Sequence, residues 1–402
     1  MSRVFGEFKV PEAVYAGRGA LQMLPQASSS LGKRALIVTD EVMERLGYVA
    51  QMQRMLAEAG VQADVFAEVN TEPTDVHVET GVRAFLQHGC DHLIALGGGS
   101  AIDAAKGISV MAVHEGYIGD YMGGRRTFDK APYPVIAIPT TAGTGSEVTS
   151  VTVITNTKDD VKMMIRQPAL LPKVAIVDPQ LTVSSPPHVT ASSGVDALCH
   201  AIEAFISRRS HPLTDALATD AAKKIVTYLE RAYNDGQDLE AREGMAIAAL
   251  EAGMAFTNSS VCLVHGMSRP IGALFHVPHG FANAMLLPTV LEFRLDDYAP
   301  RLALLARALN PELSGASDGE AAAWVVRRVK TLAERLQIPN LKTWGIERDA
   351  FERALDKMAN DALASGSPAN HPVVPSHEEI VQLYRQAYDA TWDAAPMESL
   401  TK

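Results

Sequence analysis

The 402-residue chain has only three cysteines, and these form no recognisable redox or metal-binding pair. Cys90, Cys199 and Cys262 include no C-x-x-C motif, and three cysteines cannot all be paired with one another. This pattern excludes a disulfide-rich fold and is typical of a reducing compartment. Cys199 and Cys262 lie close to potential metal ligands, but we interpret both as small buried packing residues.

The sequence also lacks a basic cluster and a long apolar segment. Its formal net charge is −11, whereas binding to nucleic-acid phosphates requires a concentrated patch of Lys and Arg. No run approaches the roughly 18 apolar residues of a membrane-spanning helix. The N-terminus MSRVFGEFKV has no apolar signal-peptide core. We therefore expect a cytoplasmic protein that binds neither nucleic acid nor membrane.

The N-terminal part of the chain alternates short β-rich runs with helical patterns. Strands are expected at residues 34–39, 61–69, 134–140 and 173–179, helices at 41–60 and 75–89, and a strand, glycine turn and helix across 92–111. Strands that alternate with helices indicate βαβ units with right-handed crossovers. The pattern predicts an α/β domain built on a Rossmann-like parallel sheet.

The pattern changes after residue 179. From Thr190 onward the sequence is dominated by long helical patterns with few β-branched runs between them, at 215–234, 239–257 and 319–337. Two prolines in SSPP (184–187) interrupt regular structure, and the chain is long for a single core. We therefore predict an α/β domain over residues 1–184 and an all-α domain over 185–402.

Four side chains in the C-terminal half have the composition of a mononuclear metal site. Asp196 and His200 are four residues apart in an apolar, helix-like stretch, so they share one face. His265 and His279 follow in HGMSRPIGALFHVPHG. One oxygen and three imidazole ligands suit Fe(II) or Zn(II) better than calcium or magnesium. A single buried histidine is more often structural, so the prediction depends on the four together.

A glycine turn suggests that the N-terminal domain binds an anion. Gly97, Gly98 and Gly99 lie between a predicted strand and helix, and Ser100 is a plausible N-cap. Backbone N–H groups and the helix dipole at such a turn favour a pyrophosphate. The G-x-G-x-x-G fingerprint is not satisfied, because Asp103 replaces its last glycine. An ordinary turn remains at least as good an interpretation of this motif alone.

Polar residues near two other strand ends also suit a dinucleotide. Thr140, Thr141, Thr144 and Ser146 directly follow a predicted strand, where a parallel sheet offers a ligand crevice. A solvated loop is the alternative. Asp40, at the end of another strand, could accept hydrogen bonds from a ribose and favour NAD over NADP. It could equally be the N-cap of the following helix.

Four motifs together carry a family resemblance. With GGGSAIDAAKG, PTTAGTGSEVT, GVDALCHAIEAF and HGMSRPIGALFHVPHG in this order, the chain resembles the iron-containing (group III) alcohol dehydrogenases over nearly its full length. The resemblance implies a dehydroquinate synthase-like architecture, in which a dinucleotide domain and a helical metal domain enclose a cleft. It implies Fe(2+) or Zn(2+) ligands Asp196, His200, His265 and His279, and NAD(P) contacts from Asp40, Gly97, Gly98, Gly99, Ser100, Thr140, Thr141, Thr144, Ser146 and Lys162.

The implied activity is reversible hydride transfer between a small primary alcohol or aldehyde and NAD(H), in preference to NADP(H), by a homodimer or higher homo-oligomer. A hydroxyacid-oxoacid transhydrogenase with tightly held nucleotide, a sugar-phosphate cyclase, and a non-catalytic metal or nucleotide sensor are the alternatives. Net NADH production on addition of an alcohol would exclude the cyclase, whereas the transhydrogenase would show turnover only with a second carbonyl acceptor. Both loops and all four ligands being intact argues against the sensor.

One position departs from the family pattern. Many family members have a histidine four residues after the third ligand, whereas this chain has Arg269. An arginine cannot relay a proton near pH 7, but it can bind an anionic substrate group in bidentate fashion. It could equally pair with a protein carboxylate or with the cofactor pyrophosphate. His276, bound water and the ribose hydroxyls are then the candidates for the proton relay.

Overall fold

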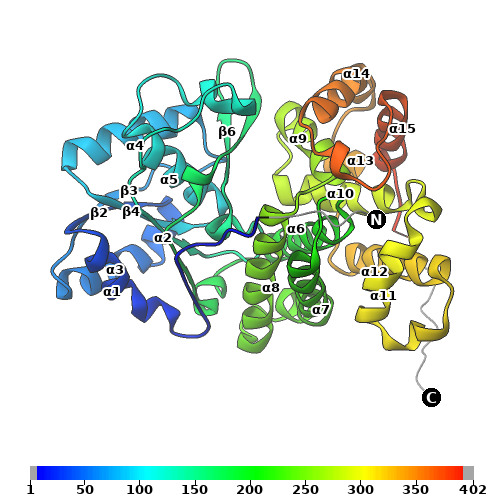
Figure 1. Cartoon of the computed structure of the whole chain (residues 1–402), viewed down its shortest axis with the longest axis horizontal. Coiled ribbons are helices and arrows are strands. Elements are labelled where there is room, and N and C mark those ends of the chain that lie inside the picture. Colours follow the sequence, from blue (N-terminus) through cyan, green and yellow to red (C-terminus); the bar gives the residue numbers. More distant parts are fainter. Residues whose placement is uncertain (1–6, 393–402) are drawn as a thin grey trace.

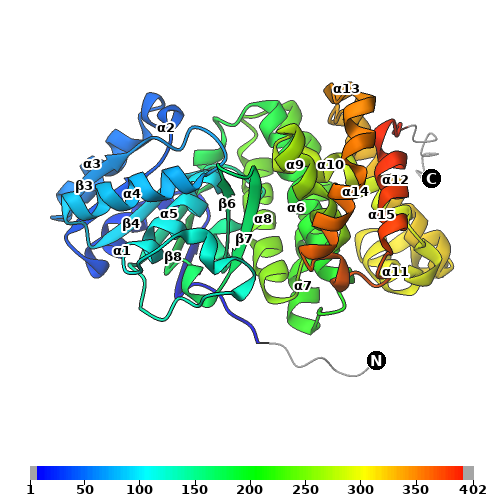
Figure 2. The same cartoon turned by 90° about the horizontal axis from the view of Figure 1, so that it is seen from above.

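The computed structural model describes residues 7–392, which form an α/β half and a helical half side by side. Figure 1 shows the sheet and its helices on one side and the C-terminal helices on the other. The helices at residues 239–258 and 263–275 contact the α/β half, whereas those at 299–309 and 377–388 lie at the far end of the molecule (Figure 2). The predicted fold class, a parallel-sheet domain followed by a helical domain, is confirmed.

Within residues 7–392, six parallel strands form the main sheet in the order β1-β8-β5-β4-β2-β3. The strands are β1 (Ala13–Ala16), β2 (Arg34–Val38), β3 (Gln62–Phe66), β4 (His92–Gly97), β5 (Val135–Pro139) and β8 (Val174–Val177). The central strands β4 and β5 are buried along their whole length. Helices cover both faces of a parallel sheet, so such strands are apolar on both sides.

The helices of the α/β half are α1 (Leu24–Leu31), α2 (Glu41–Arg45), α3 (Tyr48–Glu58), α4 (Asp75–His88) and α5 (Gly99–Met111). Side chains of α1 and α3 form an apolar cluster on one face of the sheet, and those of α4 and α5 form another on the opposite face (Figure 1). The single helix predicted over 41–60 is wrong. Gly47 has a φ of 80°, a left-handed conformation that divides the stretch into α2 and α3.

Two structures in this half were not predicted from the sequence. β1 is a four-residue edge strand beside β8. An antiparallel hairpin, β6 (Val151–Asn156) and β7 (Val161–Arg166), follows the loop at residues 140–146, which we call the threonine-rich loop. The hairpin lies at the junction of the two halves (Figure 2), where β7 contacts α9 (Leu263–Phe275) of the helical half.

The helical half consists of α6 (Pro187–Ile206), α7 (Pro212–Asn234), α8 (Leu239–Asn258), α9 (Leu263–Phe275), α10 (His279–Glu292), α11 (Ala299–Leu309), α12 (Asp318–Arg335), α13 (Leu341–Trp344), α14 (Arg348–Ala364) and α15 (His377–Tyr388). Their inward faces share one apolar core. β8 ends at Val177 and α6 begins at Pro187, on either side of the boundary that we propose at residues 184 and 185.

Among residues 7–392, no single helix has both the length and the apolar character of a membrane span. The helices α8 and α9 reach that length and apolar character only when they are taken together, and they are bent by 102° relative to one another. Most of the apolar residues of both helices are buried in the protein core.

The strand register brings three loops to one edge of the sheet. Val38 of β2 pairs with Ala95 of β4, and Gly97 of β4 pairs with Pro139 of β5. The residues that follow these strands are Asp40, the glycine turn and the threonine-rich loop. Because the carboxyl ends of parallel strands define a ligand crevice, the fold alone places these three features together.

Candidate metal and nucleotide site

A cavity of about 500 Å³ lies between the two halves and gathers most of the predicted site residues. The α/β half contributes Gly98, Gly99, Ser100, Thr141, Thr144, Ser146 and Lys162 to its lining. The helical half contributes Asp196, His200, His265, Arg269 and His279. The two groups of motifs, which are separate in the sequence, therefore face a single space.

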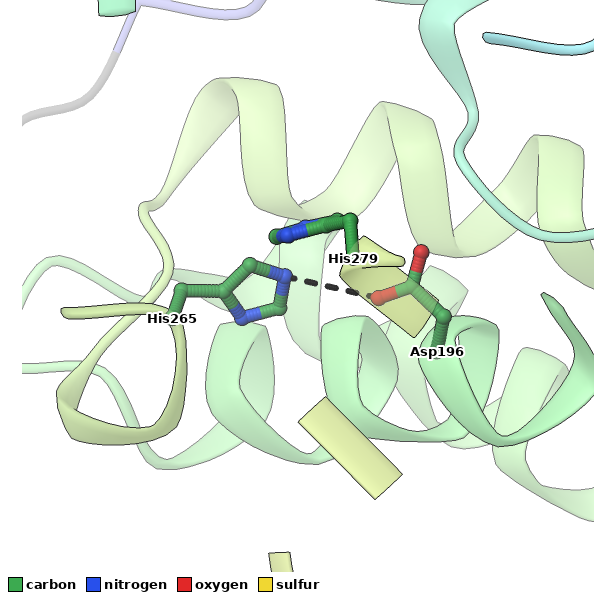
Figure 3. A group of neighbouring side chains, drawn as sticks. All are labelled: Asp196, His265 and His279. Atoms are coloured by element: carbon green, nitrogen blue, oxygen red, sulfur yellow. Dashed lines mark ion pairs between the residues drawn. The ribbon is translucent and has the colours of Figure 1, made fainter. Parts of the chain in front are cut away.

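The four predicted metal ligands come from three helices that pack against one another. Asp196 and His200 are one turn apart on α6, His265 is in the first turn of α9, and His279 is the first residue of α10. Figure 3 shows Asp196, His265 and His279 converging, with a dashed line joining Asp196 Oδ1 and His265 Nε2, which are 3.6 Å apart. His200 Nε2 lies 2.9 Å from His265 Nε2.

Asp196, His265 and His279 converge closely enough to hold one ion, since their ligand atoms all lie within 4.8 Å of one another. His200 is not part of this group and reaches it through His265. Donor atoms about 2.1 Å from a tetrahedral centre are roughly 3.4 Å from one another. The separation of 3.6 Å between Asp196 Oδ1 and His265 Nε2 lies close to that value. Asn283 Nδ2 is 2.6 Å from Asp196 Oδ1 and 3.1 Å from Nε2 of both His265 and His279. The three possible ligand atoms of Asp196, His265 and His279 therefore surround a common point. The residues present are able to hold Fe(II) or Zn(II).

The electrostatics of Asp196, His200 and His279 suit metal binding, whereas at His265 the effect of burial is outweighed by the neighbouring carboxylates of Asp196 and Glu203, which raise its pKa. Burial lowers the pKa of His200 to about 4 and that of His279 to about 3, so both imidazoles are neutral at pH 7. Burial alone would raise the pKa of Asp196, but the neighbouring histidines, His200 foremost, hold it below its usual range. A charged carboxylate and neutral imidazoles are the protonation states that ligate a metal.

Glu203 is a buried carboxylate that the sequence analysis did not single out. Its Oε2 lies 2.7 Å from His265 Nδ1 and accepts the Cys262 N–H at 2.8 Å, and its Oε1 accepts the Val264 N–H at 2.7 Å. A carboxylate on the far ring nitrogen orients a histidine ligand and increases its basicity. Glu203 therefore fixes the His265 ring with Nε2 turned toward the other ligands. In the sequence, the feature that could have pointed to Glu203 is a carboxylate three residues after His200 in an otherwise apolar helix.

Cys199 and Cys262 are buried and free. Cys199 Sγ lies 3.8 Å from His265 Nδ1, on the side of the ring already occupied by Glu203. Burial raises the pKa of both thiols well above its ordinary value, so they stay protonated at neutral pH. Neutral, buried thiols agree with their interpretation as packing residues.

The opposite wall of the cavity is built from backbone and hydroxyl groups. Gly98 precedes α5, and Gly99 is the first residue of that helix. A Cβ at Gly99 would lie 2.8 Å from Thr144 Cγ2, so the two loops approach too closely for a side chain there. The Thr140 N–H donates to the Gly97 carbonyl at 3.0 Å, which ties the loops together directly. The free end of α5 faces the cavity and suits a pyrophosphate.

The threonine-rich loop is held by Lys106, whose ammonium also forms an ion pair with Asp103. Lys106 Nζ donates to Ser146 Oγ at 2.8 Å, Thr149 Oγ1 at 3.1 Å and the Val151 carbonyl at 2.8 Å. Ser146 Oγ in turn donates to Asp103 Oδ1 at 2.5 Å. Asp103, which breaks the dinucleotide fingerprint, thus has a structural partner on the next loop. Burial lowers the pKa of Lys106 to about 8.

The other predicted cofactor residues occupy supporting positions. Asp40 Oδ1 accepts the N–H groups of Val42 and Met43 as the N-cap of α2. Its Oδ2 lies 3.5 Å from the place of a Cβ on Gly97, so the carboxylate is also beside the glycine turn. Gly97 and Thr140 shape that turn without lining the cavity. Lys162 lines the cavity and pairs with Glu72 at 2.7 Å.

Arg269 and His276 have different positions relative to the site. α9 continues through Pro270, so Arg269 lies one turn after His265 on the same face and lines the cavity. His276 is the C-cap of α9, with a φ of 53°; it is exposed and does not line the cavity. Because α9 ends at Phe275, His276 does not continue the helical face that lines the cavity. The structure therefore gives no support to His276 as a proton relay.

With this geometry in place, comparison with known proteins identifies the class. The family model of iron-containing alcohol dehydrogenase matches residues 11–179, and that of the C-terminal part of the same family matches residues 190–388. The chain therefore belongs to the iron-containing alcohol dehydrogenases, which are metal-dependent oxidoreductases.

Particular relatives cover almost the whole chain. It is 37% identical to the NAD-dependent methanol dehydrogenase of Bacillus methanolicus over 94% of this chain and 99% of the relative. A crystal structure of 1,3-propanediol oxidoreductase superposes with a TM-score of 0.91 at 37% identity, covering 96% of this chain and 100% of that one. The sulfoacetaldehyde reductase of Bifidobacterium kashiwanohense, solved with NAD+, gives a TM-score of 0.85 at 28% identity, covering 96% and 99%.

Proposed function

We propose that this protein oxidises a small primary alcohol, and reduces the corresponding aldehyde, with NAD(H) as the hydride carrier. The observation that carries this proposal is that the four metal-binding side chains and the glycine turn line one cavity. A metal site and a dinucleotide site facing each other can hold a substrate oxygen and a nicotinamide at the same carbon.

Each wall has a distinct task in this reaction. When bound, the divalent ion supplies Lewis acidity toward the substrate oxygen, and the nicotinamide accepts or donates the hydride. Asp196, His200, His265 and His279 hold the ion. Phe256, stacked on His200 with ring centroids 4.2 Å apart, is an apolar part of the same cavity lining. Oxidation of the alcohol by NAD+ yields aldehyde, NADH and one proton.

We propose NAD as the preferred cofactor because Asp40 lies beside the glycine turn. A carboxylate there can accept hydrogen bonds from the ribose hydroxyls and repels a 2′-phosphate. The proposed roles of Gly98, Gly99 and Ser100 are to bind the pyrophosphate, while Thr141, Thr144 and Lys162 line its path toward the metal. The NAD-dependent name of the Bacillus methanolicus relative agrees with this preference.

The test is NADH formation by the metal-loaded protein on addition of a primary alcohol as the only substrate. We expect turnover that exhaustive chelation abolishes and Fe(II) or Zn(II) restores. Turnover that requires a second carbonyl compound and releases no free NADH would indicate a transhydrogenase instead. Elemental analysis of anaerobically purified protein identifies the resident ion.

We also propose that the enzyme acts in the cytoplasm as a homodimer or larger homo-oligomer. The three buried, free thiols support a reducing compartment. Sedimentation velocity of the purified protein measures the assembly, and a monomer at micromolar concentration contradicts that part of the proposal.

A further inference from the structure

Arg269 is a cation of the cavity without a charged protein partner. Its Nη1 donates to Ser367 Oγ at 2.9 Å, and both residues line the cavity. Within residues 7–392, no carboxylate forms an ion pair with this guanidinium. Glu203 acts on its pKa, but the Glu203 oxygens are already engaged by His265, Cys262 and Val264.

A half-buried guanidinium with one neutral protein partner is an energetically poor arrangement. The group carries five N–H donors, and removing it from water without a counter-charge is costly. Burial lowers the pKa of Arg269 to about 10, so it stays charged at neutral pH. The charge is thus retained in the cavity although the protein supplies no anion for it, which points to a ligand that does.

Two anions could enter the cavity, the cofactor pyrophosphate and an anionic group of the substrate. The position of Arg269 favours the second. The N-terminal end of α5, suited to the cofactor pyrophosphate, belongs to the other wall of the cavity. Arg269 follows the metal ligand His265 by one helical turn, which is about 6 Å along the helix axis. Of the two other cations in the lining, Lys162 is paired with Glu72, and Arg166 donates to the Thr257 carbonyl. Of these three cations, Arg269 is the one on a helix that carries a predicted metal ligand, whereas Lys162 and Arg166 belong to β7, so we place Arg269 beside the substrate end.

We propose that Arg269 binds an oxyanion group, such as a carboxylate or sulfonate, at the far end of a short aldehyde or alcohol whose oxygen meets the metal site. The planar guanidinium matches such a group in bidentate fashion. This inference rests on the proposed dehydrogenase function and narrows its substrate class to short ω-anionic aldehydes and alcohols.

The experiment compares two aldehydes of similar length, 4-oxobutanoate and pentanal, with the metal-loaded enzyme and NADH. The wild type is expected to have the higher kcat/KM for 4-oxobutanoate. Arg269→Gln is expected to lose about 100-fold in kcat/KM for that substrate, or about 2.7 kcal/mol, and to change less than about threefold with pentanal. Arg269→Lys keeps the charge without the planar fork and should fall between the two.

Two controls make the result specific. Arg231→Gln makes the same change at an arginine that pairs with Asp238 and Glu240 outside the cavity lining, and it should leave the ratio of the two kcat/KM values within about threefold of wild type. The Kd of NAD+, measured by fluorescence, should be the same in Arg269→Gln and wild type. An unchanged substrate ratio in Arg269→Gln overturns the proposal, as does a weakened NAD+ affinity with that ratio unchanged.

Binding measurements separate this inference from the proposed function. If the wild type turns over neither aldehyde, the Kd of 4-oxobutanoate from calorimetry still tests the arginine. Weaker binding to Arg269→Gln, and intermediate binding to Arg269→Lys, then support anion recognition while the dehydrogenase function fails. Equal binding to wild type and both variants overturns the inference. Thermal unfolding of each variant verifies that it is folded.

Discussion

The two walls of the cavity bind by different means. The helical wall uses side chains, with three imidazoles, a carboxylate and a guanidinium placed by the turns of α6, α9 and α10. The sheet wall uses backbone, with a glycine turn and hydroxyls held by a buried lysine. A site made of side chains loses its ligand when one of those side chains is replaced. A site made of backbone groups loses its ligand when the side chains that hold the loop in place are replaced. Substitutions on one wall should therefore leave binding at the other intact.

The largest effect is expected for His265→Ala. This substitution removes a proposed ligand, whose Nε2 lies 2.9 Å from His200 Nε2 and 3.6 Å from Asp196 Oδ1. We expect loss of bound metal and of turnover, with NAD+ affinity unchanged, because the glycine turn belongs to the other wall. Metal analysis and NAD+ titration measure both. His276→Asn is the matched control: it changes an exposed histidine at the end of the same helix and should keep metal and activity. Activity in His265→Ala after exhaustive chelation contradicts the metal site.

The converse substitution is Lys106→Met. Its buried ammonium supports Ser146, Thr149 and the Val151 carbonyl, and its loss leaves Asp103 without a nearby cation. Breaking a buried ion pair in this way costs about 3–5 kcal/mol of unfolding free energy. Urea denaturation should show this loss, together with a higher Kd for NAD+ and an unchanged metal content.

The double variant Asp103→Asn/Lys106→Met is the control for that pair. Removing the carboxylate charge as well should recover part of the stability, because no uncompensated ion is then buried. Equal stability of the single and double variants would show that the ion pair does not hold the loop. Loss of metal in Lys106→Met would show that the two walls are coupled.

A smaller effect is expected for Glu203→Gln. The amide can still accept one backbone N–H, but it lacks the charge that polarises His265 Nδ1. Such outer partners typically contribute 10–100-fold to metal affinity. Competition with a chromogenic chelator measures this loss. Glu251→Gln, on α8 and paired with Lys224 away from the cavity, provides the control. The same metal affinity in both variants would exclude the orienting role of Glu203.

The contrast between the walls also explains what the sequence could predict. The proposed metal ligands could be singled out because the helical period places Asp196 and His200 on one face, and because few structural roles require such a combination. Glu203 and Lys106 were not singled out, because their partners are about 60 and 40 residues away and only the fold brings them together. The continuous apolar runs predicted the buried strands. β1 is an apolar run of only four residues, AVYA, and the two strands of the β6–β7 hairpin mix apolar with polar residues. Gly47 divides a helix whose apolar pattern continues past it.

The smallest effect concerns Asp40, whose two roles can be separated by a single substitution. Asp40→Ser keeps a hydroxyl acceptor for the N–H groups of Val42 and Met43, since serine is as good an N-cap as aspartate. It removes the negative charge beside the glycine turn. If that carboxylate selects NAD, the ratio of kcat/KM for NAD+ over NADP+ should fall by about tenfold, or about 1.4 kcal/mol, with Tm unchanged. If Asp40 is only the cap of α2, the ratio stays constant, and the cofactor preference must then come from the shape of the backbone wall itself.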